Sequence, residues 1–208
     1  TTHYFVESIH RRDNHLSVGF LGISHLLPAL TKCGQSELAF ALLEQKGNPG
    51  WLYSVINGAT TIWERWNSYI AETGTFGDVS MNSFNHYAYG SIGQWLYRTV
   101  LGIQTGENAD EAGYHKIFLT PSWGGTLTYA KGEQETPFGK IASSWEKKDN
   151  SIVYHCTIPA NTTAHLTLPA SGHNSVQILE GAAITDTAAV SGVADFELVS
   201  GSYTFKIY

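Results

Sequence analysis

The stretch TGENADEAG, residues 105–113, separates two different hydrophobic patterns and thereby decides the fold. Before it, apolar residues recur at the three- and four-residue spacing of amphipathic helices. After it, apolar and polar residues alternate, as they do in half-buried strands. The sequence therefore predicts an α + β protein with separate domains: residues 1–104 helical, residues 105–113 a linker, and residues 114–208 all-β.

Two neighbouring helices are predicted early in the chain. Ser24 can cap a helix over residues 24–34, in which Pro28 lies near the first turn, where a missing N–H is tolerated. Ser36 can cap a second helix over residues 36–47. Because the connection between them is so short, the two helices should form an antiparallel hairpin.

A third helix is predicted over residues 84–103, where apolar side chains again recur at helical spacing. Residues 48–82, in contrast, have little periodicity and are rich in Gly, Asn, Thr and Trp. A long irregular connection inside a compact domain is usually functional. Three or four amphipathic helices bury little apolar surface by themselves, so we expect residues 1–104 to be an incomplete domain.

The second half of the chain contains regularly spaced strand patterns. SIVYHCTIP (151–159) and SYTFKIY (202–208) alternate apolar and polar residues, and turn-forming residues occur at 148–150, 171–172 and 200–201. Several short strands at this spacing are typical of an antiparallel β-sandwich.

Composition excludes several classes of function. The chain has 208 residues, a net charge of −6 and no run of Lys or Arg, so neither nucleic acid nor an anionic membrane is an expected partner. No stretch has the roughly 18 uninterrupted apolar residues of a membrane span. The 6 Trp, 11 Tyr and 9 Phe suit either a surface that stacks on sugar rings or large aromatic cores.

Metal, cofactor and redox chemistry find little support. The sequence has no HExxH, CxxC, GxSxG or glycine-rich phosphate motif, so we predict no metal and no cofactor. His155 and Cys156 should point to opposite faces of one strand. A disulfide between Cys33 and Cys156 would join different domains, and two buried free thiols are the better prediction. Such scarce cysteines fit several compartments, of which we favour the periplasm or the extracellular space.

One carboxylate has a distinctive setting. In GATTIWERW (58–66), Glu64 lies between Trp63 and Trp66 and beside Arg65. Glycoside hydrolysis needs carboxyl groups near the anomeric carbon, and indole rings can stack on a sugar. The alternative is that Glu64 pairs with Arg65 and only stabilises a loop.

A second cluster of polar candidate residues lies in MNSFNHYAYG (81–90). Asn82, Asn85 and His86 are predicted at the start of the third helix, where backbone donors and polar side chains point beyond the helix end. Sugar hydroxyls need such donors and acceptors. The alternative for His86 is a helix cap or a contact with solvent.

Four segments together resemble a known family. They are NHLSVGFLG (14–22), GWLYSVINGATTIWERW (50–66), MNSFNHYAYGSIGQWLYRTVLGI (81–103) and GYHKIFLTP (113–121). In this order and spacing they resemble the C-terminal part of the bacterial α-L-rhamnosidases of glycoside hydrolase family 78. The resemblance covers nearly the whole chain. It implies part of a six-hairpin (α/α) barrel followed by a C-terminal β-sandwich, and hydrolysis of terminal α-L-rhamnose with inversion.

The resemblance also implies roles for individual residues. It makes Glu64 the general base and His86 a contact of the bound rhamnose. Trp51 and Trp63 become candidates for the aromatic wall, beside Trp66 and Asn85 as further substrate-binding candidates.

One departure from the family pattern is large, because nothing here matches the acidic motif that carries the general acid. We therefore expect a rhamnosidase fragment that is weak or inactive alone. Its expected partners are a rhamnose-containing glycoside or polysaccharide and the missing part of the barrel or another copy of the chain. The alternative is a non-catalytic carbohydrate-binding or assembly module.

Overall fold

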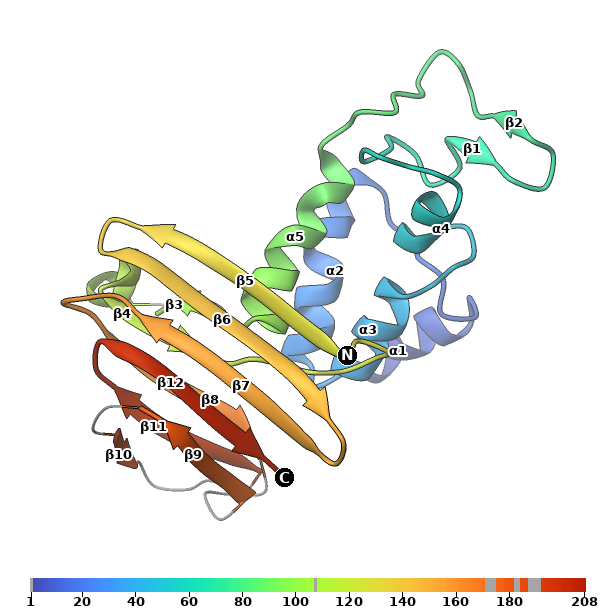
Figure 1. Cartoon of the computed structure of the whole chain (residues 1–208). Coiled ribbons are helices and arrows are strands. Elements are labelled where there is room, and N and C mark those ends of the chain that lie inside the picture. The colour runs from blue at the N-terminus through green and yellow to red at the C-terminus, as the bar shows by residue number, and fades with distance from the viewer. Residues whose placement is uncertain (1, 107, 171–174, 182–183, 187–191) are drawn as a thin grey trace. The chain divides into compact units, whose positions relative to one another are not determined.

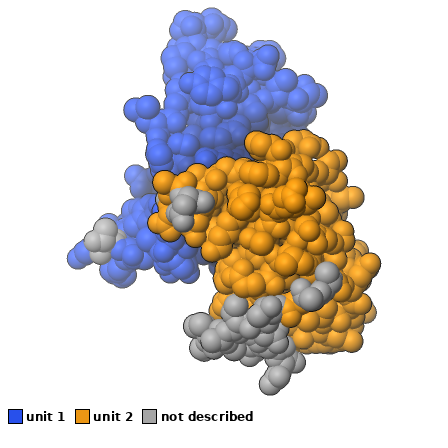
Figure 2. Space-filling view, turned by 90° about the vertical axis from the view of Figure 1, so that its left-hand side faces the viewer, with its two compact units in different colours: residues 1–95, 124–126 blue, residues 96–123, 127–208 orange. Residues whose placement is uncertain are grey.

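The described α-helices lie in the first half of the chain, and most of the described strands lie in the second half (Figure 1). The computed structural model describes residues 2–106, 108–170, 175–181, 184–186 and 192–208. The chain forms two compact units, the first comprising residues 1–95 and 124–126, and the second residues 96–123 and 127–208 (Figure 2). The division precedes the predicted 105–113 linker because residues 103–105 already pair within a sheet of the second unit.

The first unit is built on short helices around an apolar core that contains aliphatic and aromatic side chains. They are α1 (Thr2–His10), α2 (Phe20–Lys32), α3 (Ser36–Leu43) and α4 (Trp51–Ile56). Helices α2 and α3 pack against each other, as the predicted hairpin requires, and Leu27, Leu30, Phe40 and Leu42 are almost fully buried. Among the described residues, no helix is long and apolar enough to cross a membrane.

Helix α2 begins four residues earlier than predicted. Gly19, in an extended conformation, is the N-cap, and its carbonyl accepts the N–H groups of Gly22 and Ile23 at 3.2 and 3.1 Å. Ser24 therefore lies inside the helix and does not cap it. Pro28 also lies in the helix interior, and the expectation that it occupies the first turn was wrong.

The predicted third helix is shorter and less regular than a single α-helix over residues 84–103. A 3₁₀ turn η1 (Ala88–Ser91), a short α5 (Ile92–Trp95) and a π-helical turn η2 (Leu96–Val100) follow one another. Residues 84–87 are not helical, because the backbone of this segment is hydrogen-bonded to an earlier loop. The His86 N–H donates to the Ile62 carbonyl at 2.8 Å. The last helical turn ends at Val100, and Gly102, with φ of +74°, follows two residues later.

The connection over residues 48–82 is less irregular than predicted. It contains α4 and a small hairpin of β1 (Tyr69–Ile70) and β2 (Thr75–Phe76). The first unit also takes in residues 124–126 from much later in the chain. The Glu44 carboxylate accepts the Thr126 N–H at 2.8 Å, and a Cβ added to Gly124 would lie 2.4 Å from the Phe40 ring.

The second unit is a sandwich of two five-stranded sheets (Figure 1). One sheet has the order β10 (Ile184–Asp186), β11 (Val193–Leu198), β8 (Thr163–Pro169), β4 (Lys116–Leu119) and β3 (Ile103–Thr105). The other has the order β5 (Tyr129–Thr136), β6 (Gly139–Lys148), β7 (Ser151–Ile158), β12 (Gly201–Ile207) and β9 (Val176–Glu180). A 3₁₀ segment η3 (Ala109–Tyr114) precedes β4. All described pairs are antiparallel except β4 with β8, which is parallel.

The strands predicted from alternation are confirmed as β7 and β12. Cys156 on β7 is buried while the adjacent His155 is exposed, as expected of successive residues in a strand. The sheets meet through rings such as Phe196 and Phe205, whose centroids are 5.2 Å apart. Asp149 (φ 50°) lies in the predicted turn at 148–150. The predicted turn at 171–172 lies outside the described residues.

The two cysteines are both free thiols, but only Cys156 is buried. Cys33 is exposed at the C-cap of α2, so the prediction of two buried thiols was wrong for Cys33. Burial raises the pKa of Cys156 to about 12. At pH 8 this thiol stays protonated and is a poor nucleophile.

We therefore expect one thiol per chain to react with a disulfide reagent at pH 8 under native conditions, and two after denaturation. Mass spectrometry of the modified chain would show which cysteine reacted. Cys33→Ser should abolish the native reaction, and rapid labelling of Cys156 in the folded chain would contradict the packing described here.

Candidate active site

Glu64 lies in a loop that runs beside residues 83–86. The Glu64 N–H donates to the Ser83 carbonyl at 2.9 Å, and the Ser83 N–H donates to the Glu64 Oε2 at 2.7 Å. The bond from His86 to Ile62 joins the same two segments further along. This pairing brings the WERW and NHYA segments of the sequence together. It also orients the Glu64 carboxylate through one oxygen, and within the described residues Oε1 accepts no hydrogen bond.

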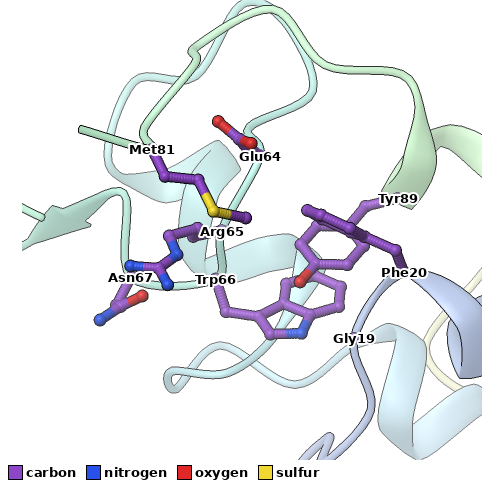
Figure 3. A pocket seen from close by; sticks show the side chains of 8 residues that line it. All are labelled: Gly19, Phe20, Glu64, Arg65, Trp66, Asn67, Met81 and Tyr89. Atoms are coloured by element: carbon purple, nitrogen blue, oxygen red, sulfur yellow. The ribbon is translucent and has the colours of Figure 1, made fainter. Parts of the chain in front are cut away.

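The Glu64 carboxylate stands at a pocket of about 340 Å³ (Figure 3). The pocket is lined by Gly19, Phe20, Glu64, Arg65, Trp66, Asn67, Met81 and Tyr89. Figure 3 shows the polar side chains of Arg65 and Asn67 on one side and the rings of Phe20, Trp66 and Tyr89 on the other. Such a pocket combines apolar rings with a few polar groups, as small-molecule sites usually do.

The aromatic side of the pocket is fixed by stacking and by indole hydrogen bonds. Trp66 lies flat on Tyr89, with ring centroids 3.7 Å apart and planes 5° apart. Trp51 meets Trp66 edge-on at 5.3 Å, and its indole N–H donates to the Tyr89 carbonyl at 2.9 Å. The indole N–H of Trp66 donates to the Val18 carbonyl at 3.0 Å. The rings are therefore held in one arrangement before any ligand binds.

Trp51 and Trp63, the candidate wall residues, lie behind this pocket. Both are buried, each 7% exposed, and neither is among the side chains that line it. Trp63 packs edge-on against Phe84 at 5.4 Å. Both tryptophans line a cavity of about 10 Å³ next to the pocket. The rings that line the pocket are instead those of Phe20, Tyr89 and the third predicted tryptophan, Trp66.

His86 and Asn85 line a neighbouring open depression of about 590 Å³. The His86 ring stacks on Phe20, with centroids 4.9 Å apart, so that Phe20 connects the depression to the Glu64 pocket. The Ala88 N–H donates to His86 Nδ1 at 3.3 Å, which in the neutral ring puts the proton on Nε2. His86 Nδ1 thus accepts the first N–H of η1, and its Nε2 can donate to another group. Asn85 is exposed.

The Arg65 and Glu64 side chains point in different directions (Figure 3). Within the described residues no ion pair joins these two neighbours, and Figure 3 shows the Arg65 guanidinium turned toward Asn67 and away from the Glu64 carboxylate. The alternative that Glu64 only pairs with Arg65 therefore finds no contact to support it. Burial raises the pKa of Tyr89, against a lowering by the Arg65 charge, and the Glu64 charge raises it further. The Tyr89 hydroxyl thus stays neutral at physiological pH.

Sequence reasoning did not single out Phe20, Tyr89 or Asn67 as site residues. A signal for the first two existed, because Phe20 belongs to NHLSVGFLG and Tyr89 to NHYAYG. With Ser24 as the predicted cap, Phe20 falls outside the predicted helix, and Tyr89 is not one of the residues on which the helical repeat is based. No pattern in the sequence indicated a role for Asn67. Among the described residues, no group of three or more His, Cys, Asp or Glu side chains could hold a metal ion.

Two family models match consecutive parts of the chain. Residues 1–100 match the bacterial α-L-rhamnosidase six-hairpin glycosidase domain, and residues 102–183 match the bacterial α-L-rhamnosidase C-terminal domain. The chain belongs to the bacterial α-L-rhamnosidase family. The resemblance stated from the sequence motifs is thereby confirmed, as is the fold class, part of a six-hairpin domain followed by a β-sandwich.

Curated α-L-rhamnosidases are similar along most of this chain. One from Streptomyces avermitilis is 41% identical over 202 residues, which make up 97% of this chain and 19% of that protein. One from Formosa agariphila is 42% identical over 173 residues, or 83% of this chain and 18% of that protein. The chain thus spans about a fifth of the length of these rhamnosidases.

Solved rhamnosidase structures share the fold. The crystal structure of the Streptomyces avermitilis α-L-rhamnosidase complexed with L-rhamnose matches 98% of this chain and 19% of its own, with a TM-score of 0.88 and 40% identity. The α-L-rhamnosidase from Dictyoglumus thermophilum matches 96% of this chain and 22% of its own, with a TM-score of 0.77 and 30% identity.

Proposed function

We propose that this chain carries the general base and one side of the sugar pocket of an inverting α-L-rhamnosidase. The observation that carries the proposal is the Glu64 carboxylate, held by the Ser83 N–H at the edge of a pocket with aromatic lining. A general base needs a fixed carboxylate with an oxygen left for the water it deprotonates. Glu64 meets this requirement, because Oε2 accepts the Ser83 N–H and Oε1 accepts no hydrogen bond within the described residues.

The sugar is proposed to be a terminal α-L-rhamnosyl group of a glycoside or polysaccharide. Support comes from the relative whose structure is a complex with L-rhamnose and which aligns with 98% of this chain. Phe20, Trp66 and Tyr89 offer an apolar side to the pyranose ring, while Arg65 and Asn67 offer donors to its hydroxyls. His86 Nε2 is a further donor in the adjoining depression.

The general acid is proposed to lie outside this chain. Inversion needs a second carboxyl group about 6.5–9.5 Å from the base, across the anomeric carbon. Glu64 is the one carboxylate among the described residues that line the pocket. Three other acids of the first unit have partners away from the pocket: Glu44 binds Thr126, Glu7 pairs with Arg11, and Asp78 accepts from Ser80. The chain alone should therefore hydrolyse an α-L-rhamnoside weakly or not at all.

The proposed macromolecular partner is the remainder of a rhamnosidase polypeptide. Several apolar side chains of the first unit are exposed, including Leu21 (94%), Val79 (92%) and Val55 (58%). Exposed apolar patches favour association, here with further helices of the barrel or with a second copy of the chain. Light scattering of the purified chain would test self-association, which a monodisperse monomer would exclude.

A second candidate function is sugar binding without turnover. The presence of one carboxylate in an aromatic pocket favours it, because stacking and hydrogen bonding need no acid. The two functions share the pocket and differ in catalysis. A rhamnosidase that contains this chain would hydrolyse an aryl α-L-rhamnoside, whereas a binding module would only retain rhamnose.

Phe20→Ala is expected to weaken the binding of L-rhamnose to the chain by about tenfold, because it removes an exposed ring of the pocket and the support of His86. Titration of the ¹⁵N-labelled chain with L-rhamnose, followed by NMR, would measure this change. Tyr4→Ala, which removes a ring that is 75% exposed on α1, should leave binding unchanged. Equal effects of the two variants, or equal binding of D-glucose, would contradict the proposed site.

A further inference from the structure

Ser68 connects the loop that carries Glu64 to the segment that carries Ser83. Ser68 is fully buried, with 0% of its surface exposed. Its hydroxyl accepts the Arg65 N–H at 3.2 Å, one residue after Glu64. Its carbonyl accepts the Asn82 Nδ2–H at 2.9 Å, one residue before Ser83. Both partners of the Glu64–Ser83 pair are therefore anchored, through their neighbours, on the same buried residue.

One atom of the Asn82 side chain lowers the stability of the folded chain. Its Oδ1 atom is buried and has no hydrogen-bond partner within the described part of the chain. A buried polar atom without a partner destabilises the folded state, so an apolar side chain of similar size would avoid this loss. The amide supplies its Nδ2 donor, which the Ser68 carbonyl accepts together with the Gly77 N–H. This arrangement points to positioning of the 81–85 segment as the task of Asn82.

We propose that Asn82 is a positioning residue for the catalytic base. By fixing the 81–85 segment on Ser68, it holds the Ser83 N–H against Glu64 Oε2, while Oε1 accepts no hydrogen bond within the described residues. Asn82 does not itself line the pocket, so its proposed effect on Glu64 is indirect and passes through the Ser83 N–H. The catalytic consequence rests on the proposed function, whereas the positioning of Ser83 does not.

Hydrogen exchange of the Ser83 amide tests the positioning directly. In Asn82→Ala, the Ser83 N–H of the 208-residue chain should exchange about tenfold faster, the scale of one lost hydrogen bond, and approach its rate in Glu64→Ala. Asn57→Ala is the matched control, because it removes an amide that donates to the Tyr53 carbonyl at 2.8 Å, away from the pocket. The inference is overturned if Ser83 exchanges at the wild-type rate in folded Asn82→Ala.

Asn82→Asp keeps the inference testable if Asn82→Ala does not fold. The Asp side chain has the same size but, when ionised, presents an oxygen to the Ser68 carbonyl in place of a donor. At pH 7 this repulsion should displace the segment and accelerate exchange at Ser83. Wild-type exchange at Ser83 in this variant would equally overturn the inference.

The catalytic consequence is measured in a rhamnosidase polypeptide that contains this chain. Asn82→Ala should lower kcat by about 10- to 100-fold with KM nearly unchanged, because a small displacement of a catalytic group impairs chemistry more than binding. A rise in KM with kcat retained would overturn the catalytic consequence. If the wild-type polypeptide has no rhamnosidase activity, the proposed function fails, and the exchange experiment still decides whether Asn82 positions Ser83.

Discussion

Replacing Glu64 with Gln is expected to lower kcat for an aryl α-L-rhamnoside by about 10²- to 10⁴-fold in a rhamnosidase polypeptide that contains this chain, the range typical of a general base. Gln has the size of Glu, and its amide oxygen can still accept the Ser83 N–H that Glu64 Oε2 accepts at 2.7 Å. The substitution therefore preserves the local structure and removes only the basic oxygen. Initial rates of phenolate release, measured over a range of substrate concentrations, separate kcat from KM.

Glu72→Gln is the matched control for this experiment. Glu72 is exposed between β1 and β2 and does not line the pocket, so its loss of charge should leave kcat unchanged. The Glu64→Gln polypeptide should still bind L-rhamnose, because the stack of Trp66 on Tyr89 remains. Activity close to wild type in Glu64→Gln would exclude Glu64 as the base. Loss of rhamnose binding together with turnover would instead indicate a structural role.

Trp145→Ala is expected to destabilise the β-sandwich by about 3–5 kcal/mol, the usual cost of removing a buried Trp side chain. Trp145 is 1% exposed on β6, and its indole N–H donates to the Val100 carbonyl at 2.8 Å. The substitution leaves both a cavity and an unpaired buried carbonyl. Since domains are usually stable by only about 5–15 kcal/mol, much of the folded stability would be lost. Urea denaturation followed by circular dichroism measures the change.

Two further variants separate the contributions of packing and hydrogen bonding at this position. Trp145→Phe retains much of the ring but removes the N–H donor, so it should cost less than Trp145→Ala and still more than a surface substitution. Tyr129→Ala, at a residue that is 69% exposed on β5, should change the free energy of unfolding by less than about 0.5 kcal/mol. Equal stability of Trp145→Ala and Tyr129→Ala would contradict the core described here.

The strands could be predicted well because alternation is a local signal. In SIVYHCTIP each side chain's neighbours two residues away already show which face is buried, and β7 follows this pattern with Tyr154 and Cys156 inside. The ends of helices could not be predicted as well. Ser24 was an adequate cap by its chemistry, but the chain turns into α2 at Gly19, where an extended backbone begins the hydrogen bonding.

The candidate site was predictable in its residue types and less so in its assembly. Glu64, Trp66 and His86 could be named from motifs, because unusual side chains in fixed spacing remain visible in a single sequence. Phe20, which lines the pocket and supports His86, comes from a segment more than forty residues earlier than Glu64. Trp51 and Trp63 carried the same aromatic signal as Trp66, yet they are buried behind the pocket.

The amino-acid sequence by itself determined the order of a helical part and a strand part, the family, and the carboxylate to be considered as a base. These depend on periodicity and on short motifs, which neighbouring residues specify. Only the tertiary structure decided which aromatic rings face the pocket, that Arg65 turns away from Glu64, and that the Ser83 N–H holds the carboxylate. The physical reason is that burial and hydrogen-bond geometry arise between segments distant in the chain, and no local pattern encodes them.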